Sequence, residues 1–133
     1  MWLCTKHGFF SVKRDCEDRY FIRARRRGDL ENLVDLMSLQ WISSPDEAEL
    51  IRTPDECDDY NACTAFLIHE WPAADYRYRL IVSRKALLAV YAELADGIDY
   101  TNFKSEVACH EGQRDHLELY HRVWAVMGKL QED

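Results

Sequence analysis

Four arginines and one phenylalanine, on two segments of alternating apolar and polar residues, carry the clearest chemical signal in this sequence. The segments are 19–25 and 77–82, and the five residues are Phe21, Arg23, Arg25, Arg77 and Arg79. If the segments are neighbouring strands, these side chains share one sheet face, because alternate residues of a strand point the same way. Guanidinium groups beside an aromatic ring suit phosphates and stacked bases, so this face is a candidate site for single-stranded nucleic acid or a phosphate ligand.

An uneven charge distribution gives these arginines a second interpretation. The 133 residues contain 24 acids and 17 bases, a net charge of -7, yet residues 1–30 sum to +4, residues 31–75 to -10 and residues 76–133 to -1. The acidic middle segment can fold over the arginine face and neutralise it, in which case the arginines are structural. The net charge also argues against a protein that coats DNA.

A polar segment between two expected helices is a second candidate site. Its hydrogen-bonding residues are Asp99, Tyr100, Asn102 and Lys104. Connections between helices often carry functional residues. The competing interpretation is helix capping, in which Asp99 or Thr101 accepts hydrogen bonds from the first N–H groups of the next helix.

The familiar signatures of catalysis and cofactor binding are missing from the sequence. Its five glycines form neither GxGxxG nor GxxxxGK, and no GxSxG turn of a serine hydrolase occurs. Cys57, Cys63 and His69 form a C-x5-C-x5-H string, but zinc sites usually bring paired ligands two to four residues apart. We therefore expect no catalytic residue, no cofactor and no metal site, and a function other than catalysis.

The cysteines and the apolar runs point to the cytoplasm. The five cysteines are odd in number and form no CxxC motif, so we expect reduced thiols and no disulfide framework. The opening residues lack the basic and apolar regions of a secretory signal, and the longest apolar run, 86–92, is far shorter than a membrane span. We expect a cytoplasmic protein without a membrane segment.

The elements that must position these residues follow from hydrophobic periodicity. Strands are expected at 19–25 and 77–82, and segments 2–6 and 9–13 are expected to form a hairpin or one bent strand, with backbone freedom for the turn supplied at His7 and Gly8. Four helices are expected, at 29–39, from Ser83 to near Gly97, at 102–110 with Gly112 closing it, and at 114–130. Asp29 and Ser83 are the expected N-caps of the first two helices. In the last helix one apolar stripe is formed by Leu117, Tyr120, Trp124 and Met127.

These elements predict a single α+β domain over residues 1–133. We expect a mostly antiparallel sheet with helices packed on one face, compatible with a ferredoxin-like topology, and C-terminal helices that complete the core. All three prolines fall in the acidic stretch 43–75, which we interpret as a loop-rich insertion with short strands at 49–52 and 64–69.

The opening MWLCTKHGFFSV, the segments YRYRLIVSR and IDYTNFKSEV, and the closing LYHRVW resemble a family of small uncharacterised proteins of bacteria and their phages. Its members are similar in opening M-W-x-x-T-x-x-G-F-F-S and in a D-Y-x-N-F-K segment. The family has no assigned activity, so the resemblance implies no catalytic residues. The acidic stretch 43–70 is longer than the family pattern, and we expect a partner contact there to be particular to this chain.

Together these observations predict a small non-enzymatic cytosolic protein that binds another macromolecule, in the first place a protein, through its charge-segregated surface. The alternative is a module that binds single-stranded nucleic acid or a phosphate ligand through the arginine face. The position of the acidic segment 43–75 discriminates between them, because covered arginines favour a scaffold and open ones favour an anionic ligand.

Overall fold

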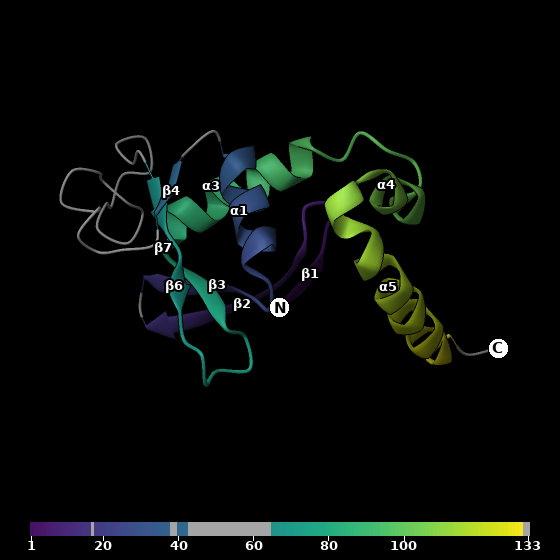
Figure 1. The fold of residues 1–133 in the computed structure, drawn as a ribbon, viewed down its shortest axis with the longest axis horizontal. Coiled ribbons are helices and arrows are strands. Elements are labelled where there is room, and N and C mark those ends of the chain that lie inside the picture. Colours follow the sequence, from purple (N-terminus) through teal and green to yellow (C-terminus); the bar gives the residue numbers. More distant parts are fainter. Residues whose placement is uncertain (17, 38–39, 43–64, 132–133) are drawn as a thin grey trace.

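A five-stranded antiparallel sheet forms the centre of the structure (Figure 1). The computed structural model describes residues 1–16, 18–37, 40–42 and 65–131. In spatial order the strands are β1 (Trp2–Cys4), β2 (Phe9–Cys16), β3 (Arg19–Ala24), β7 (Tyr78–Ser83) and β6 (His69–Glu70). A separate parallel pair consists of β4 (Gln40–Ile42) and β5 (Ala65–Leu67).

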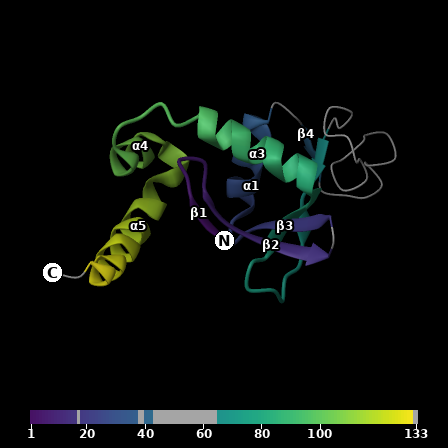
Figure 2. The same ribbon diagram turned by 180° about the vertical axis from the view of Figure 1, so that it is seen from behind.

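Two helices lie against one face of the sheet, and two more lie beyond the β1–β2 hairpin (Figures 1 and 2). The first two are α1 (Arg27–Leu36) and α3 (Arg84–Asp96). The others are α4 (Phe103–Cys109) and α5 (Arg114–Met127), with 3-10 turns at Glu111–Gln113 and Gly128–Leu130. In both views the far end of α5 extends away from the sheet.

Alternation along the central strands explains which sheet face the helices cover. Ile22 on β3 stands opposite Leu80 on β7, and both are buried in the main apolar cluster with Val82. The same cluster contains the inward residues of α1 and α3, among them Leu30, Leu33, Val34, Ala86, Leu87 and Val90. The intervening strand residues, Phe21, Arg23 and Arg79, therefore belong to the opposite face.

The predicted α+β class is confirmed, with an antiparallel sheet and helices on one face. The two arginine-bearing segments are neighbours, as β3 and β7, which the prediction of the arginine face required. In the described part of the chain, three strands precede the first helix. This order differs from the β-α-β-β-α-β order of a ferredoxin-like fold.

The N-cap of α3 is the predicted residue, and the N-cap of α1 is a different one. Ser83 Oγ accepts a hydrogen bond from the Ala86 N–H at 3.2 Å. Helix α1 begins at Arg27 after Arg26, which makes no side-chain cap, so the prediction of Asp29 as N-cap is wrong. Asp29 lies in the first turn of α1 and is 3 % exposed, because its carboxylate joins three other parts of the chain.

The C-terminal helices pack around a small cluster of their own beside the main core. Val107 of α4 and Tyr120 of α5 are buried there, and the Phe103 ring lies 5.4 Å from the Tyr120 ring. Beyond Tyr120 the predicted stripe of the last helix is not buried, since Trp124 is 68 % and Met127 is 54 % exposed. Helix α4 ends at Cys109 with His110 as its C-cap, two residues before the predicted closing residue, Gly112.

Part of the predicted acidic insertion lies outside the described residues. This holds for residues 43–64, and with them for the predicted strand at 49–52, Cys57 and Cys63. The predicted strand at 64–69 is present as the short strands β5 and β6.

Replacing Ser83 by alanine tests the capping of α3. Loss of the Ser83 hydroxyl leaves the Ala86 N–H without its side-chain acceptor, and we expect the free energy of unfolding to fall by about 1 kcal/mol. Urea unfolding followed by circular dichroism measures this change. Ser105→Ala is the matched control, because Ser105 is exposed in α4 and should change stability by less than about 0.5 kcal/mol. Equal losses in the two variants would contradict the assignment.

Candidate functional site

The structure places Phe21, Arg23 and Arg79 together on the sheet face opposite the helices. Arg23 and Arg79 stand directly opposite each other on β3 and β7. The Arg79 guanidinium carbon lies 5.5 Å from the centre of the Phe21 ring. Two like charges in such a cross-strand pair repel each other, so other groups must compensate them.

The chain after β6 covers this pair with aromatic rings. The Trp71 ring centre lies 3.6 Å from the Arg79 guanidinium carbon, and the Tyr76 ring centre lies 4.7 Å from that of Arg23. Arg79 also donates a hydrogen bond to the Tyr76 carbonyl at 2.8 Å and is only 4 % exposed. Burial, reinforced by the charge of Arg23, lowers the pKa of Arg79. The inner part of the predicted arginine face is therefore closed.

Carboxylates of the acidic segment meet the two outer arginines. Arg25 follows β3 and pairs with Asp75 at 3.3 Å, while Arg77 precedes β7 and pairs with Glu70 at 2.7 Å. Among the described residues no carboxylate pairs with Arg23 or Arg79, and the Nε atom of each is buried without a hydrogen-bond partner. The described end of the acidic segment thus neutralises the rim of this face, and aromatic rings cover its centre.

Asp99 and Tyr100, from the predicted polar site, attach the C-terminal helices to the turn between β1 and β2. Lys6 in that turn donates hydrogen bonds to Asp99 at 2.9 Å and to Glu106 at 3.4 Å. The bond to Asp99 raises the pKa of Lys6 and lowers the pKa of Asp99. The Tyr100 ring centre lies 5.5 Å from the same ammonium nitrogen. These residues therefore position helices within the fold.

The other two residues of the polar site also make contacts within the chain. Asn102 is the N-cap of α4, and its Oδ1 accepts a hydrogen bond from the Ser105 N–H at 3.0 Å. Lys104 Nζ lies 4.5 Å from the centre of the Trp124 ring on α5. The capping interpretation of this segment is correct, but the capping residue is Asn102 and not Asp99 or Thr101.

A groove of about 690 Å³ lies between the β1–β2 hairpin and α5, and we call it the hairpin–α5 groove. Trp2 and Phe9 form one wall, with their rings edge to face at 5.9 Å. Leu119 and Val123 line the α5 side. Charged residues that line the groove are Arg25, Arg26, Asp115, Glu118 and Arg122. Its volume lies within the range of small-molecule and peptide pockets, so we take it as the candidate site.

Asp29 and His116 lie in this groove and join its two sides. Asp29 accepts hydrogen bonds from the Phe9 N–H at 3.2 Å and from the Gln113 side chain at 3.0 Å. Its Oδ2 also lies 3.0 Å from His116 Nε2, while His116 Nδ1 lies 2.8 Å from Asp115 Oδ1. Carboxylates only accept hydrogen bonds, so an imidazolium that donates from both nitrogens satisfies both contacts. The hydrogen bond to Asp29 is the main cause of the raised pKa of His116.

Gly8 is required for the approach of the hairpin to Asp29. A Cβ atom on Gly8 would stand 2.5 Å from the Asp29 Cβ, a distance that side chains do not adopt. The Asn32 side chain donates a hydrogen bond to the His7 carbonyl at 3.0 Å and holds the same turn against α1. The turn residue that the sequence assigned to backbone freedom is therefore needed for close packing.

The polar groups around His116 leave little capacity for acid–base catalysis. Asp29 already accepts three hydrogen bonds, and both nitrogens of His116 face carboxylates. Arg26 pairs with the second oxygen of Asp115. A general base needs a free lone pair near its substrate, and the carboxylate of Asp29 and both nitrogens of His116 are engaged within the chain. Beside them, Gln113 Oε1 and the Tyr120 hydroxyl are buried without a hydrogen-bond partner. The cluster can hold α5 in place, and the walls around it can bind an apolar group.

The groove continues along α5 as an exposed apolar row, which we call the α5 stripe. It consists of Leu119, Val123, Val126 and Leu130, which are 44 to 73 % exposed. Sequence reasoning missed this stripe because it assigned the helix a single apolar face through Tyr120. A second row at spacings of four, three and four residues is the signal that could have revealed it. The Asp29–His116 contact has no local signal, because its residues are 87 positions apart.

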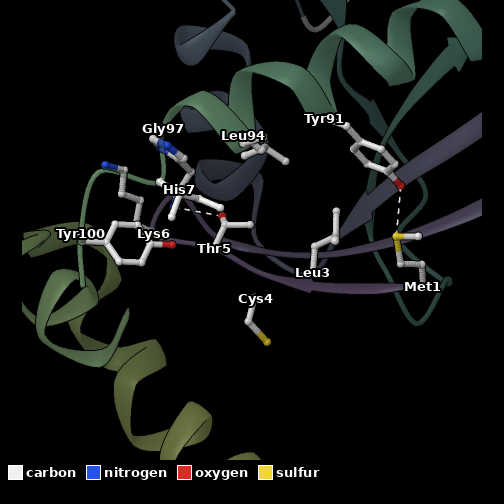
Figure 3. Close-up of a pocket in the computed structure, with 12 residues that line it drawn as sticks. Met1, Leu3, Cys4, Thr5, Lys6, His7, Tyr91, Leu94, Gly97 and Tyr100 are labelled. Atoms are coloured by element: carbon white, nitrogen blue, oxygen red, sulfur yellow. Dashed lines mark hydrogen bonds between the residues drawn. The ribbon is translucent and has the colours of Figure 1, made fainter. Parts of the chain in front are cut away.

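A smaller cavity of about 370 Å³ lies between β1 and the end of α3 (Figure 3). At one end the Tyr91 hydroxyl donates a hydrogen bond to Met1 Sδ at 3.2 Å, and at the other end lie Lys6 and Tyr100. Leu3 and Leu94 line the space between, and Cys4 points away from α3. Lys6, the charged side chain that lines this cavity, is already paired with Asp99. The cavity therefore presents fewer charged groups to a ligand than the groove does.

Comparison with protein-family models, with curated proteins and with solved structures gives no match for this chain. The resemblance drawn from the sequence motifs thus stays an expectation. None of the helices in the described part of the chain combines the length and the apolar composition that a membrane span requires.

The pH dependence of stability tests the His116 bridge. Because its pKa is raised in the folded chain, protonated His116 contributes stability that is full below the unfolded pKa of about 6.5 and is lost as pH rises through the folded value. We expect the difference in unfolding free energy between the wild type and His116→Gln to shrink across that range. Urea titrations from about pH 5.5 to 9 measure it.

His121→Gln serves as the control, because His121 is exposed on the same helix. Its difference from the wild type should stay constant with pH. A His116→Gln difference that is also constant would contradict the imidazolium bridge.

Proposed function

We propose that this protein binds another protein and that the hairpin–α5 groove and the α5 stripe form the contact surface. The observation that carries the proposal is the α5 stripe, a row of large apolar side chains that are 44 to 73 % exposed on α5 and the turn after it: Leu119, Val123, Val126 and Leu130. Soluble chains rarely expose so many apolar groups side by side, and such patches commonly mark interaction sites.

A tryptophan in the groove strengthens this interpretation. Trp2 on the hairpin wall is 69 % exposed. Tryptophan is enriched among the residues that dominate binding energies, because one rigid side chain buries a large area. Full burial of a leucine or valine contributes about 1.5–3 kcal/mol, so the groove and the stripe together offer the driving force for a specific complex.

The proposed contact surface differs from the charge-segregated surface expected from the sequence. Arg25 and Arg77 are paired with carboxylates, and Arg79 is stacked under Trp71. Charges that are occupied within the chain contribute less to a partner than exposed apolar groups do. The proposal therefore keeps a protein partner and moves the contact to apolar residues.

A non-enzymatic role in the cytoplasm is part of the proposal. It is supported by the mutual engagement of the polar groups around His116. Cys4, Cys16 and Cys109, the cysteines that the structure describes, are free thiols, as is usual in a reducing compartment.

Binding of single-stranded nucleic acid stays the second candidate, and one observation favours it. The Nε atoms of Arg23 and Arg79 lack partners, and an anion is one group that could supply them. Access favours the protein partner, because Arg79 is 4 % exposed and an anion would have to displace Trp71.

Photo-crosslinking in cells of the native host tests the protein partner. A photoreactive amino acid at position 123 or 130 should give an adduct of discrete mass with another protein. The same residue at Leu88, which is 51 % exposed on α3, should not. When the crosslinking variant also carries Leu119→Glu, the yield of the adduct should fall by about tenfold, because an unpaired carboxylate buried in the interface opposes association.

Adducts of equal yield from position 88, or no adduct from the stripe, would contradict the proposal. Circular dichroism of the Leu119→Glu variant checks that it is folded, which the exposure of Leu119 leads us to expect.

A nucleic-acid titration tests the second candidate. We expect a fluorescent oligouridine of about 20 nucleotides to show no change in anisotropy at low salt, because the inner arginines are covered. Salt-sensitive binding that disappears in Arg23→Glu would instead favour the nucleic-acid function.

A further inference from the structure

The spacing of the α5 stripe is that of a helix-packing seam. Leu119, Val123, Val126 and Leu130 follow one another at intervals of four, three and four residues. This is the pattern of a and d positions, at which two helices interlock side chains in a coiled coil. Leu119, Val123 and Val126 lie in α5 and span about 10 Å, close to two helical turns, and Leu130 continues the row in the 3-10 turn Gly128–Leu130. An α-helix of similar length is therefore the complementary shape.

The hairpin wall favours the same shape. Leu119 and Val123 belong to both the stripe and the hairpin–α5 groove, so the seam begins inside a concave site. Trp2 and Phe9 face it from the hairpin. An amphipathic helix laid into a groove with apolar anchors three and four residues apart is a common mode of peptide recognition.

The charge beside the seam is positive. Arg122 in α5 and Lys129 in the 3-10 turn after it are seven residues apart, and each immediately precedes a residue of the stripe, Val123 and Leu130. Asp115, seven residues before Arg122 at the same flanking position, is paired with Arg26 and His116, and from Leu119 to Gln131 there is no aspartate or glutamate. Arg122 pairs with Glu118 at 3.1 Å, but both side chains are about 70 % exposed, and such pairs contribute little enough to be exchanged.

We infer that the partner contacts the α5 stripe with an amphipathic helix that carries acidic residues beside its apolar seam, an inference that rests on the proposed function. Glutamates at the flanking positions of such a helix would meet Arg122 and Lys129. Interhelical pairs at these positions set partner choice and orientation in coiled coils.

A second copy of this chain is a poorer complement. In an antiparallel pair of α5 helices Arg122 would meet Lys129 of the other copy, and like charges oppose pairing. In a parallel pair Arg122 would meet Met127 of the other copy, which carries no charge to complement it. An anionic membrane is also disfavoured, because the whole chain carries a net charge of -7.

Two synthetic helices test the inference directly. They share one leucine and isoleucine seam of about three heptads and differ only in their flanking residues, glutamate in one and lysine in the other. Isothermal titration calorimetry should show the glutamate helix binding at least about tenfold more tightly, with an affinity that falls as salt rises. The double variant Arg122→Glu, Lys129→Glu should reverse the preference.

Arg84→Glu, Lys85→Glu on α3 is the control, because it changes the net charge equally and should keep the wild-type preference. Binding of neither helix, or equal binding of both, would overturn the inference. So would a dimer of the free protein in sedimentation that is lost in Val123→Asp, or stripe-dependent binding to phosphatidylserine vesicles.

The crosslinking experiment separates this inference from the proposed function. If the adduct from position 123 forms equally in the wild type and in Arg122→Glu, Lys129→Glu, the protein partner stands and its acidic helix is wrong. If the adduct never forms, both are wrong. A reduced adduct in the double variant supports both.

Discussion

One buried carboxylate joins parts of the chain that are otherwise separate. Asp29 receives the Phe9 N–H from the hairpin and the side chains of Gln113 and His116 from the C-terminal helices, while its own backbone belongs to α1. At 3 % exposure an uncompensated charge would be strongly unfavourable. The three donors are therefore interdependent, and the site tolerates the hairpin only because Gly8 has no side chain. The hairpin–α5 groove exists because these contacts hold its walls apart at a fixed spacing.

Local sequence patterns were sufficient for the four helices and for most strands, because hydrophobic period is a property of neighbouring residues. Strand β4 was not predicted, and the pairing of β3 with β7 was only a condition of the arginine-face hypothesis. Local patterns were not sufficient for Asp29 either. An aspartate near a helix start satisfies the pattern of an N-cap equally well whether it caps or accepts hydrogen bonds from elsewhere. The partner that decides between these roles, His116, is 87 residues away, and no sequence pattern near Asp29 indicates it. The groove was not predicted for the same reason, since its two walls are far apart in the sequence.

Charge counts were similarly limited as a guide to the arginine face. Compensation by the acidic segment was one of the two interpretations that the charge counts allowed, and Asp75 and Glu70 do pair with the outer arginines. The inner pair is compensated by the faces of Trp71 and Tyr76 and by a backbone carbonyl, groups that carry no formal charge. A sum of formal charges along the sequence does not include such partners. On α5 the error was different: the helix has two apolar rows, of which the predicted one is buried at Tyr120 but exposed at Trp124 and Met127, and the second one was missed.

Helix α5 is fixed near its first turn and free along its distal half, so proton binding and partner binding act on the same helix. His116 holds the near end through two carboxylates, and the stripe begins three residues later at Leu119. If a partner requires the docked position of α5, thermodynamic reciprocity makes its binding increase the affinity of His116 for a proton. A complex formed on this surface would then take up protons as it assembles, and its dissociation constant would depend on pH.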